Sequence, residues 1–133
     1  GSALFVTAGQ AFDPYFGQAH VGSAKAGIEM LMQTLAVEWG EYGIRVNTVI
    51  PGPIANTKGM EVLGGDMSDE RLSAAVPLGA LGNASDIANL AAFLASPHAA
   101  WITGASIRVD GGSNLLGAGG FNASVKQFFA AAE

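Results

Sequence analysis

Lys25 is the side chain in this sequence that is best placed for chemistry. It lies near the start of a long helical pattern, within the small-residue segment S-A-K-A-G at residues 23–27. An ammonium group held at a site can stabilise negative charge that develops during a reaction. Tyr15 and His20 are the nearby side chains that can donate a proton, although each also fits a packing or capping role. A solvated surface lysine is the alternative interpretation of Lys25.

A second candidate is the ligand-binding loop P-G-P-I, formed by Pro51, Gly52, Pro53 and Ile54 and followed three residues later by Thr57. The two prolines restrict the backbone, and Gly52 allows the backbone to approach a ligand closely. The hydroxyl group of Thr57 can donate a hydrogen bond. Taken alone, this motif indicates only a loop, so its interpretation depends on the segments around it.

The common signatures of nucleotide, metal and hydrolase sites are missing from this sequence. There is no G-x-G-x-x-G between a strand and a helix, no P-loop, no H-E-x-x-H and no G-x-S-x-G. His20 and His98 are far apart and lack the spacing of metal ligands, and the chain has no cysteine. We therefore expect neither a metal site nor a disulfide framework, and the lack of cysteine agrees with a reducing compartment.

The composition indicates a folded chain with few surface charges. Of the 133 residues, 50% are hydrophobic and 13% are charged, against roughly 25% charged in a typical soluble domain. This excludes an intrinsically disordered chain and suggests that another chain or segment covers part of the apolar surface. The net charge is −5 and the six basic residues are scattered, which disfavours nucleic-acid and anionic-membrane partners. No run reaches the roughly 18 apolar residues of a membrane span.

Alternating strands and helices are expected to position the candidate residues. We predict strands over residues 3–7, 45–50 and 105–109, and helices over residues 21–40, 58–63, 68–75 and from Ser85 to the residue before Pro97. This alternation indicates parallel βαβ units and therefore an α/β fold. Ligands of such sheets lie beyond the carboxyl ends of the strands. That rule places residues 7–18, 51–57 and 110–114 along one functional edge.

The sequence also predicts how these elements pack. The long helix is expected to bury one stripe of apolar residues at spacings of three and four, namely Ala24, Ile28, Leu31, Leu35 and Trp39. Ser85 is a candidate helix cap, with Asp86 favourable in the first turn. Asn47 is interpreted as a structural residue, and Asp110 as a residue that fixes the turn before two glycines.

Three segments, taken in order and spacing, carry a family resemblance. They are S-A-K-A-G at residues 23–27, R-V-N-T-V-I-P-G-P-I at residues 45–54, and T-G-A at residues 103–105 leading to V-D-G-G at residues 109–112. Together they resemble the C-terminal half of the short-chain dehydrogenase/reductase family. The resemblance implies the C-terminal part of a doubly wound, parallel-sheet, Rossmann-like fold. We therefore expect residues 1–133 to be a single partial domain, without the family's N-terminal dinucleotide-binding half.

Within this family, the chain looks most like the peroxisomal type of 2,4-dienoyl-CoA reductase. The residues that carry this likeness are 18–25, 35–40, 51–54 and 63–65. The likeness implies NADPH-dependent reduction of 2,4-dienoyl-CoA in the β-oxidation of unsaturated fatty acids, with NAD as the alternative cofactor. It also implies an acyl-CoA substrate and a homo-oligomer, with a tetramer as the expected state. The compartments that fit are the cytoplasm and the peroxisomal or mitochondrial matrix.

The resemblance assigns roles to the candidate residues. Lys25 would bind the nicotinamide ribose, the segment from Pro51 to Ile54 would line the nicotinamide, and Thr57 would donate to a cofactor phosphate. Val21 stands where the family has its proton-donating tyrosine, four residues before the lysine. Dienoyl-CoA reductases characteristically lack that tyrosine, so this departure favours their branch.

Several alternatives remain open at this point. The family's usual active-site serine is not evident, and the nearest residues are Thr7 and Ala8. The proton donor is Tyr15, His20 or an acidic residue from the family's other half. Another short-chain reductase, such as a 3-oxoacyl reductase, and a non-catalytic interaction subunit are the alternative functions. An isolated chain of this extent is expected to be inactive.

Overall fold

Three parallel strands form the centre of the fold. A computed structural model describes residues 1–117, 125, 127 and 129–132. The strands are β1 (Ser2–Val6), β2 (Arg45–Pro51) and β3 (Ser106–Val109), and β2 lies between the other two. Both pairings are parallel, with Ser2 opposite Arg45 and Thr48 opposite Ser106. The predicted strands are confirmed to within one residue at each end.

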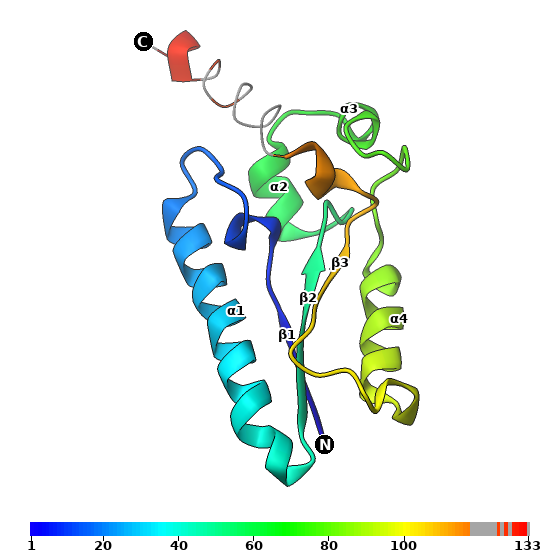
Figure 1. Ribbon diagram of the computed structural model, residues 1–133. Coiled ribbons are helices and arrows are strands. Elements are labelled where there is room, and N and C mark those ends of the chain that lie inside the picture. The colour runs from blue at the N-terminus through cyan, green and yellow to red at the C-terminus, as the bar shows by residue number, and fades with distance from the viewer. Residues whose placement is uncertain (118–124, 126, 128, 133) are drawn as a thin grey trace.

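Helices cover both faces of this sheet. The helices are α1 (Ala19–Trp39), α2 (Lys58–Gly64), α3 (Asp69–Ala74) and α4 (Ala84–Ala95). Figure 1 shows α1 on one side of the strands and α4 on the other, with α2 and α3 beyond the carboxyl ends. This is the doubly wound α/β arrangement that the alternation of elements predicts. None of the helices in the described part of the chain has the length and apolar character needed to cross a membrane.

Two apolar cores lie on the two faces of the sheet, because side chains alternate along a strand. The core under α1 contains the buried residues Met32, Ala36 and Val46. The core under α4 contains the buried residues Val49, Leu94 and Ala99. Neighbouring residues of one strand therefore serve different cores, as Phe5 packs on the α1 side and Leu4 on the α4 side.

The predicted apolar stripe of the long helix is partly wrong. Ile28, Leu35 and Trp39 are half-buried as expected, but Ala24 is exposed and Leu31 is 47% exposed. The buried face instead contains Glu29, Met32 and Ala36. The helix is apolar on more than one side, so the spacing of its apolar residues alone does not determine which side faces the sheet.

The cap of α4 also differs from the prediction. The N-cap residue is Asn83 rather than Ser85, which lies in the first turn. The backbone N–H of Asn83 donates to the carboxylate of Asp86 at 2.7 Å. The helix therefore begins with a capping-box contact between residues 83 and 86. Asp86 is in the first turn, as predicted.

Two polar side chains of β2 hold the far end of α4 against the sheet. The guanidinium of Arg45 donates to the carbonyl oxygens of Leu94 at 2.7 Å and of Ser96 and Ile102 at 3.3 Å. The amide of Asn47 donates to the carbonyl of Ile102 at 2.9 Å and accepts from the backbone N–H of Ala105 at 3.0 Å. The structural role predicted for Asn47 is confirmed.

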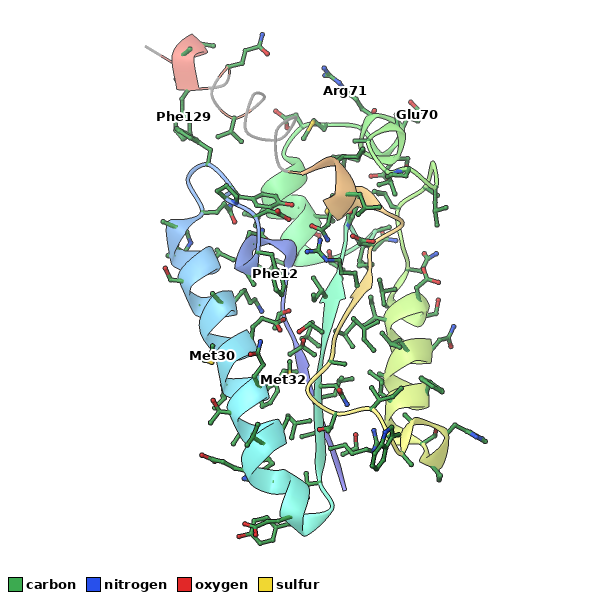
Figure 2. All side chains as sticks on the ribbon, in the orientation of Figure 1. Phe12, Met30, Met32, Glu70, Arg71 and Phe129 are labelled. Atoms are coloured by element: carbon green, nitrogen blue, oxygen red, sulfur yellow. The ribbon has the colours of Figure 1, made fainter. Side chains whose placement is uncertain are left out.

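The orientation of α1 can be tested with two methionines of the same helix. Met32 is fully buried, whereas Met30 is 61% exposed (Figure 2). Met32→Ala is expected to lower the free energy of unfolding by about 2–5 kcal/mol, because it leaves a cavity in the core. Met30→Ala is expected to change it by less than about 0.5 kcal/mol. Chemical denaturation measures both, and equal losses would contradict this orientation of the helix.

Candidate functional site

The segments that follow the three strands meet at one edge of the sheet, as the sequence predicts. The backbone N–H of Gly52 donates to the carbonyl of Val109 at 2.9 Å. A Cβ atom at Gly52 would lie 2.6 Å from the Cα of Asp110, and one at Gly9 would collide with the side chain of Asn114. Glycine is therefore required at residue 52, because the two backbones approach too closely for a larger residue, whereas at Gly9 a larger residue would have to displace the Asn114 side chain.

Lys25 lies at this edge, beside the carboxyl end of β1. Helix α1 begins at Ala19, two residues earlier than predicted, so Lys25 is in the second turn. The side chain is half-buried, and its Nζ donates to the carbonyl oxygen of Val6 at 3.2 Å. Val6 is the last residue of β1. Because an ammonium group has three N–H donors, two remain for a ligand at the strand ends.

Glu29, one turn further along α1, is a buried carboxylate that the sequence analysis missed. Its side chain is only 5% exposed. Its Oε1 accepts from the hydroxyl of Thr7 at 2.5 Å, and its Oε2 accepts from Thr48 at 3.0 Å and Ser106 at 2.6 Å. One hydroxyl comes from each strand or from the residue directly after it. The available signal was these three hydroxyl residues in or directly after the predicted strands.

The Pro-Gly-Pro-Ile loop leaves the sheet and pairs with a second loop. Pro51 is the last residue of β2. The carbonyl of Pro53 accepts from the N–H of Gly82 at 3.0 Å, and Ile54 is 8% exposed and bridges to Gly82. Ile54 therefore anchors the loop through its side chain, while Pro51 and Gly52 form the backbone at the strand ends.

Thr57 caps the short helix α2. Its hydroxyl accepts from the backbone N–H of Met60 at 3.3 Å and donates to the carbonyl of Ile54 at 2.8 Å. The first contact gives a backbone N–H of the first helical turn its acceptor. The second holds the Thr57 hydroxyl in place. A phosphate that accepted a hydrogen bond from this hydroxyl would have to replace the carbonyl of Ile54 as its acceptor.

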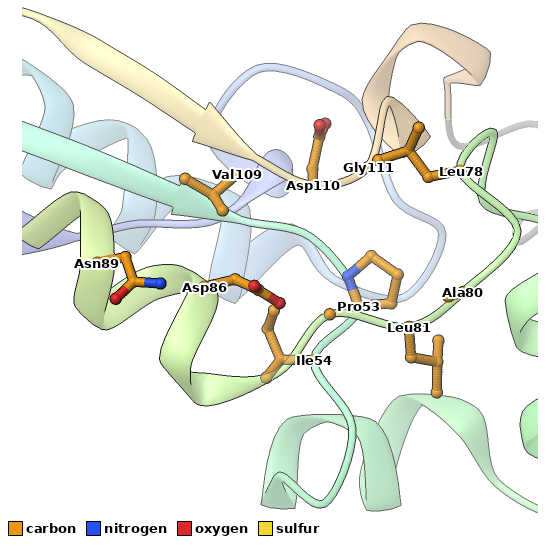
Figure 3. A pocket seen from close by; sticks show the side chains of 11 residues that line it. Pro53, Ile54, Leu78, Ala80, Leu81, Asp86, Asn89, Val109, Asp110 and Gly111 are labelled. Atoms are coloured by element: carbon orange, nitrogen blue, oxygen red, sulfur yellow. The ribbon is translucent and has the colours of Figure 1, made fainter.

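A cavity of about 550 Å³ opens beside this loop, on the α4 side of the strand ends. Figure 3 shows Pro53 and Ile54 on one wall, Asp86 and Asn89 of α4 on another, and Leu78 near Gly111. The walls thus combine apolar side chains with a few polar groups. Such a lining is typical of small-molecule sites.

Tyr15 lies among charged groups at the same edge. Burial raises the pKa of Tyr15 above its ordinary value of 10.0, and the negative charges of Asp13 and Asp110 act in the same direction, against the positive charge of Arg108. The phenol therefore keeps its proton at neutral pH. The guanidinium of Arg108 lies 4.0 Å from a carboxylate oxygen of Asp13 and 5.3 Å from the ring centre of Phe12.

His20, the other predicted donor, is exposed in the first turn of α1. Val21, at the position of the family's tyrosine, is half-buried in the same turn. Among the described residues, no group of three or more histidine, aspartate or glutamate side chains is arranged to hold a metal ion.

Asp110 organises the turn after β3, as the sequence predicts. Its carboxylate accepts from the backbone N–H of Gly112 at 2.9 Å, and from the backbone and side-chain nitrogens of Asn114 at 3.1 and 2.8 Å. Burial alone raises the pKa of Asp110, but these hydrogen bonds and the charge of Arg108 outweigh it. The resulting pKa lies below the ordinary value of 3.8.

Several known proteins are similar to this chain. Residues 1–114 match a family described as enoyl-(acyl carrier protein) reductase. A peroxisomal 2,4-dienoyl-CoA reductase of Saccharomyces cerevisiae, named as producing (3E)-enoyl-CoA, is 47% identical over 120 residues, or 88% of this chain and 40% of that protein. An L-rhamnose 1-dehydrogenase (NAD(P)(+)) of Azotobacter vinelandii is 47% identical over 95 residues, or 71% of this chain and 37% of that protein.

Solved structures give the same result. A short chain dehydrogenase from Bacillus anthracis aligns with a TM-score of 0.76 and 43% identity, covering 86% of this chain and 44% of that one. The chain thus spans less than half the length of each of these three proteins.

The turn at Asp110 predicts a pH-dependent contribution to stability. Because its folded pKa is lowered, the stabilisation is fully present above the ordinary value of 3.8 and is lost as the pH falls through the lower, folded value. Asp110→Asn is expected to lower the free energy of unfolding by about 1 kcal/mol at pH 7, and by less below the ordinary pKa.

Urea denaturation across this pH range measures the effect, with Asp66→Asn as the matched control because Asp66 is exposed. A difference between the wild type and Asp110→Asn that does not change with pH would contradict the prediction.

Proposed function

This chain belongs to the short-chain dehydrogenase/reductase family, and we propose that the protein containing it reduces 2,4-dienoyl-CoA thioesters with NADPH. The observation that carries the proposal is the combination of Lys25 at the strand ends with Val21 in place of a tyrosine. A carbonyl reductase needs a donor beside the carbonyl oxygen. A conjugated thioester can instead be protonated on carbon, so it tolerates the loss of that tyrosine.

The name of the yeast relative supports this substrate. The same relative is named as peroxisomal, which agrees with one of the compartments expected for this chain. The relative from Azotobacter has the same percentage identity to this chain, and its name gives a sugar substrate and both nicotinamide cofactors. We therefore keep NAD as the alternative cofactor.

The residues present fit a nicotinamide cofactor. Lys25 donates to the Val6 carbonyl at the strand ends, and two further N–H donors of its ammonium group remain for the cofactor. In the proposal, Lys25 binds the ribose hydroxyls, and the segment Pro51, Gly52, Pro53 and Ile54 lines the nicotinamide. Thr57 contacts a phosphate by exchanging its present acceptor, the Ile54 carbonyl. When bound, the cofactor supplies a hydride.

The proposed mechanism requires the chain to stabilise an enolate and to supply a proton. In the proposal, the positive charge of Lys25 stabilises the negative charge that develops on the thioester oxygen. Tyr15 is the proposed proton donor, because its hydroxyl lies beside Gly9 at the edge where the strands end and is protonated at neutral pH. His20 is the alternative within this chain, and an acidic residue of another segment is the alternative outside it.

Two other functions would use the same fold. The Azotobacter relative favours a dehydrogenase or reductase that acts on a carbonyl or alcohol, such as a 3-oxoacyl reductase. The loss of the usual tyrosine at Val21 is also compatible with a non-catalytic subunit that binds partners. Substrate preference and cofactor binding distinguish these functions.

We also propose that the protein containing this chain is a homo-oligomer, with a tetramer as the expected state. Helix α1 has large apolar side chains on its outer side, where Met30 is 61%, Leu31 47% and Val37 83% exposed. Contiguous exposed apolar residues are typical of subunit contacts.

The first functional prediction concerns turnover. The protein in its full natural length is expected to oxidise NADPH in the presence of a 2,4-dienoyl-CoA, and Lys25→Ala is expected to lower kcat/KM by about 10²-fold. Absorbance of NADPH measures both. Lys58→Ala is the matched control, because Lys58 is exposed at the start of α2.

Three outcomes would contradict this prediction. Turnover of a 3-oxoacyl-CoA without turnover of a dienoyl-CoA would favour the carbonyl reductase. Failure to bind either NADPH or NADH would favour the non-catalytic subunit. An equal loss of kcat/KM in Lys25→Ala and Lys58→Ala would contradict a specific role for Lys25.

The second functional prediction concerns the proton donor. Tyr15→Phe is expected to lower kcat by about 10²-fold or more with little change in the Kd for NADPH, because only proton transfer is removed. His20→Gln is the comparison, and it is expected to keep wild-type kcat. The reverse order of the two kcat values would assign the donor to His20, and two unchanged values would place it outside this chain.

A further inference from the structure

Glu29 has a feature that the proposed mechanism does not use. It is a carboxylate inside an otherwise apolar core, next to Met32 and Ala36 on the buried face of α1. Burial of a charged group is unfavourable unless hydrogen bonds compensate for the lost water. An apolar side chain would pack against this sheet without that penalty. The carboxylate must therefore contribute something that packing alone does not.

The hydrogen bonds of Glu29 lead directly to Lys25. The two side chains are four residues apart and so lie on the same face of α1. Oε1 of Glu29 accepts from the hydroxyl of Thr7 at 2.5 Å. The residue before Thr7 is Val6, whose carbonyl oxygen accepts from Lys25 Nζ at 3.2 Å. A chain of three residues thus connects the carboxylate to the acceptor of the lysine.

The other contacts fix both ends of this chain. The backbone N–H of Thr7 donates to the carbonyl of Val49 at 2.9 Å, which holds residue 7 against β2. The second oxygen of Glu29 accepts from Thr48 and Ser106. The carboxylate is therefore held by β2 and β3 in addition to its contact with Thr7. Rotation of the peptide between residues 6 and 7 is restrained from both sides.

We infer that Glu29 is a positioning residue, which holds Thr7 and the carbonyl of Val6 so that the ammonium group of Lys25 is fixed where the cofactor ribose binds. This inference rests on the proposed function, because it concerns the ribose contact of Lys25. Glu29 itself touches neither cofactor nor substrate. Its effect passes through Lys25 alone.

A double-mutant cycle on the full-length protein tests this inference by the Kd for NADPH, measured by fluorescence titration without substrate. Glu29→Gln keeps the size of the side chain but removes its charge and one acceptor. It is expected to weaken NADPH binding about tenfold. In the Lys25→Ala background, the same change is expected to have less than about a twofold effect. An equal effect in both backgrounds overturns the inference, because a merely structural role is independent of Lys25.

Two hydroxyl variants provide the matched control. Thr7→Val and Ser106→Ala each remove one hydrogen bond from Glu29, but only Thr7 adjoins Val6. Thr7→Val is expected to weaken NADPH binding about as much as Glu29→Gln, and Ser106→Ala by less than about twofold. Thr7→Ser keeps the hydroxyl and is expected to restore binding. Equal effects of Thr7→Val and Ser106→Ala overturn the inference.

Thermal unfolding of each variant shows whether it is folded. If the Glu29 variants do not fold, the comparison of Thr7→Val, Thr7→Ser and Ser106→Ala decides the question. Failure of the proposed function gives a different result. A wild-type protein that binds NADPH without reducing a dienoyl-CoA contradicts the substrate alone, and the cycle still decides the inference. An unchanged Kd in Lys25→Ala, or a wild type that binds neither NADPH nor NADH, overturns both.

Discussion

The buried carboxylate of Glu29 must find its hydrogen-bond donors inside the protein, and this requirement connects α1 to all three strands. Thr7, Thr48 and Ser106 supply the donors. In the parallel register Thr48 is opposite Ser106, and Thr7 is two residues beyond Phe5, the partner of Thr48 in β1. The contact therefore fixes the rotation of α1 about its own axis. That rotation turns Met32 towards the sheet and leaves Leu31 half exposed.

A second set of polar contacts does the corresponding work on the opposite face of the sheet, which α4 covers. Arg45 and Asn47, at the start of β2, bind the carbonyl oxygens where α4 ends and the backbone where β3 begins. Apolar packing alone would permit both helices to slide along the sheet, because such packing has no preferred direction. Directional hydrogen bonds on the two faces of β2 remove this freedom, so the segments after the strands keep fixed positions.

Much of this arrangement could be predicted from the sequence, because local signals determine it. The strands are short runs rich in apolar residues, each followed within a few residues by proline or glycine, and Pro51 and Gly52 mark the end of β2 clearly. The common edge of the site then follows from the parallel connections alone. Asp110 before two glycines likewise identifies its turn.

The remaining features depend on contacts between distant residues. Glutamate is a residue type that is common on the solvated face of a helix, so its type does not predict the burial of Glu29. Only the three hydroxyl groups that donate to its carboxylate explain that burial. The pair of Asp13 and Arg108 joins segments that no periodicity connects. The cap of α4 is a different case, because Asn83 followed three residues later by Asp86 is a recognisable capping signature. The neighbouring Ser85 offered an equally acceptable cap by residue type, and only the geometry distinguishes the two.

The close approach of Gly52 to Asp110 has a consequence for how proteins of this kind diverge. Two backbones in contact leave no space in which a new side chain can be tried, so the floor of the site is closed to gradual change. Exposed loops around that floor, such as residues 77–80, can change length and composition without separating the strands. New ligand preferences are therefore expected to arise in these loops, while the strand ends stay the same.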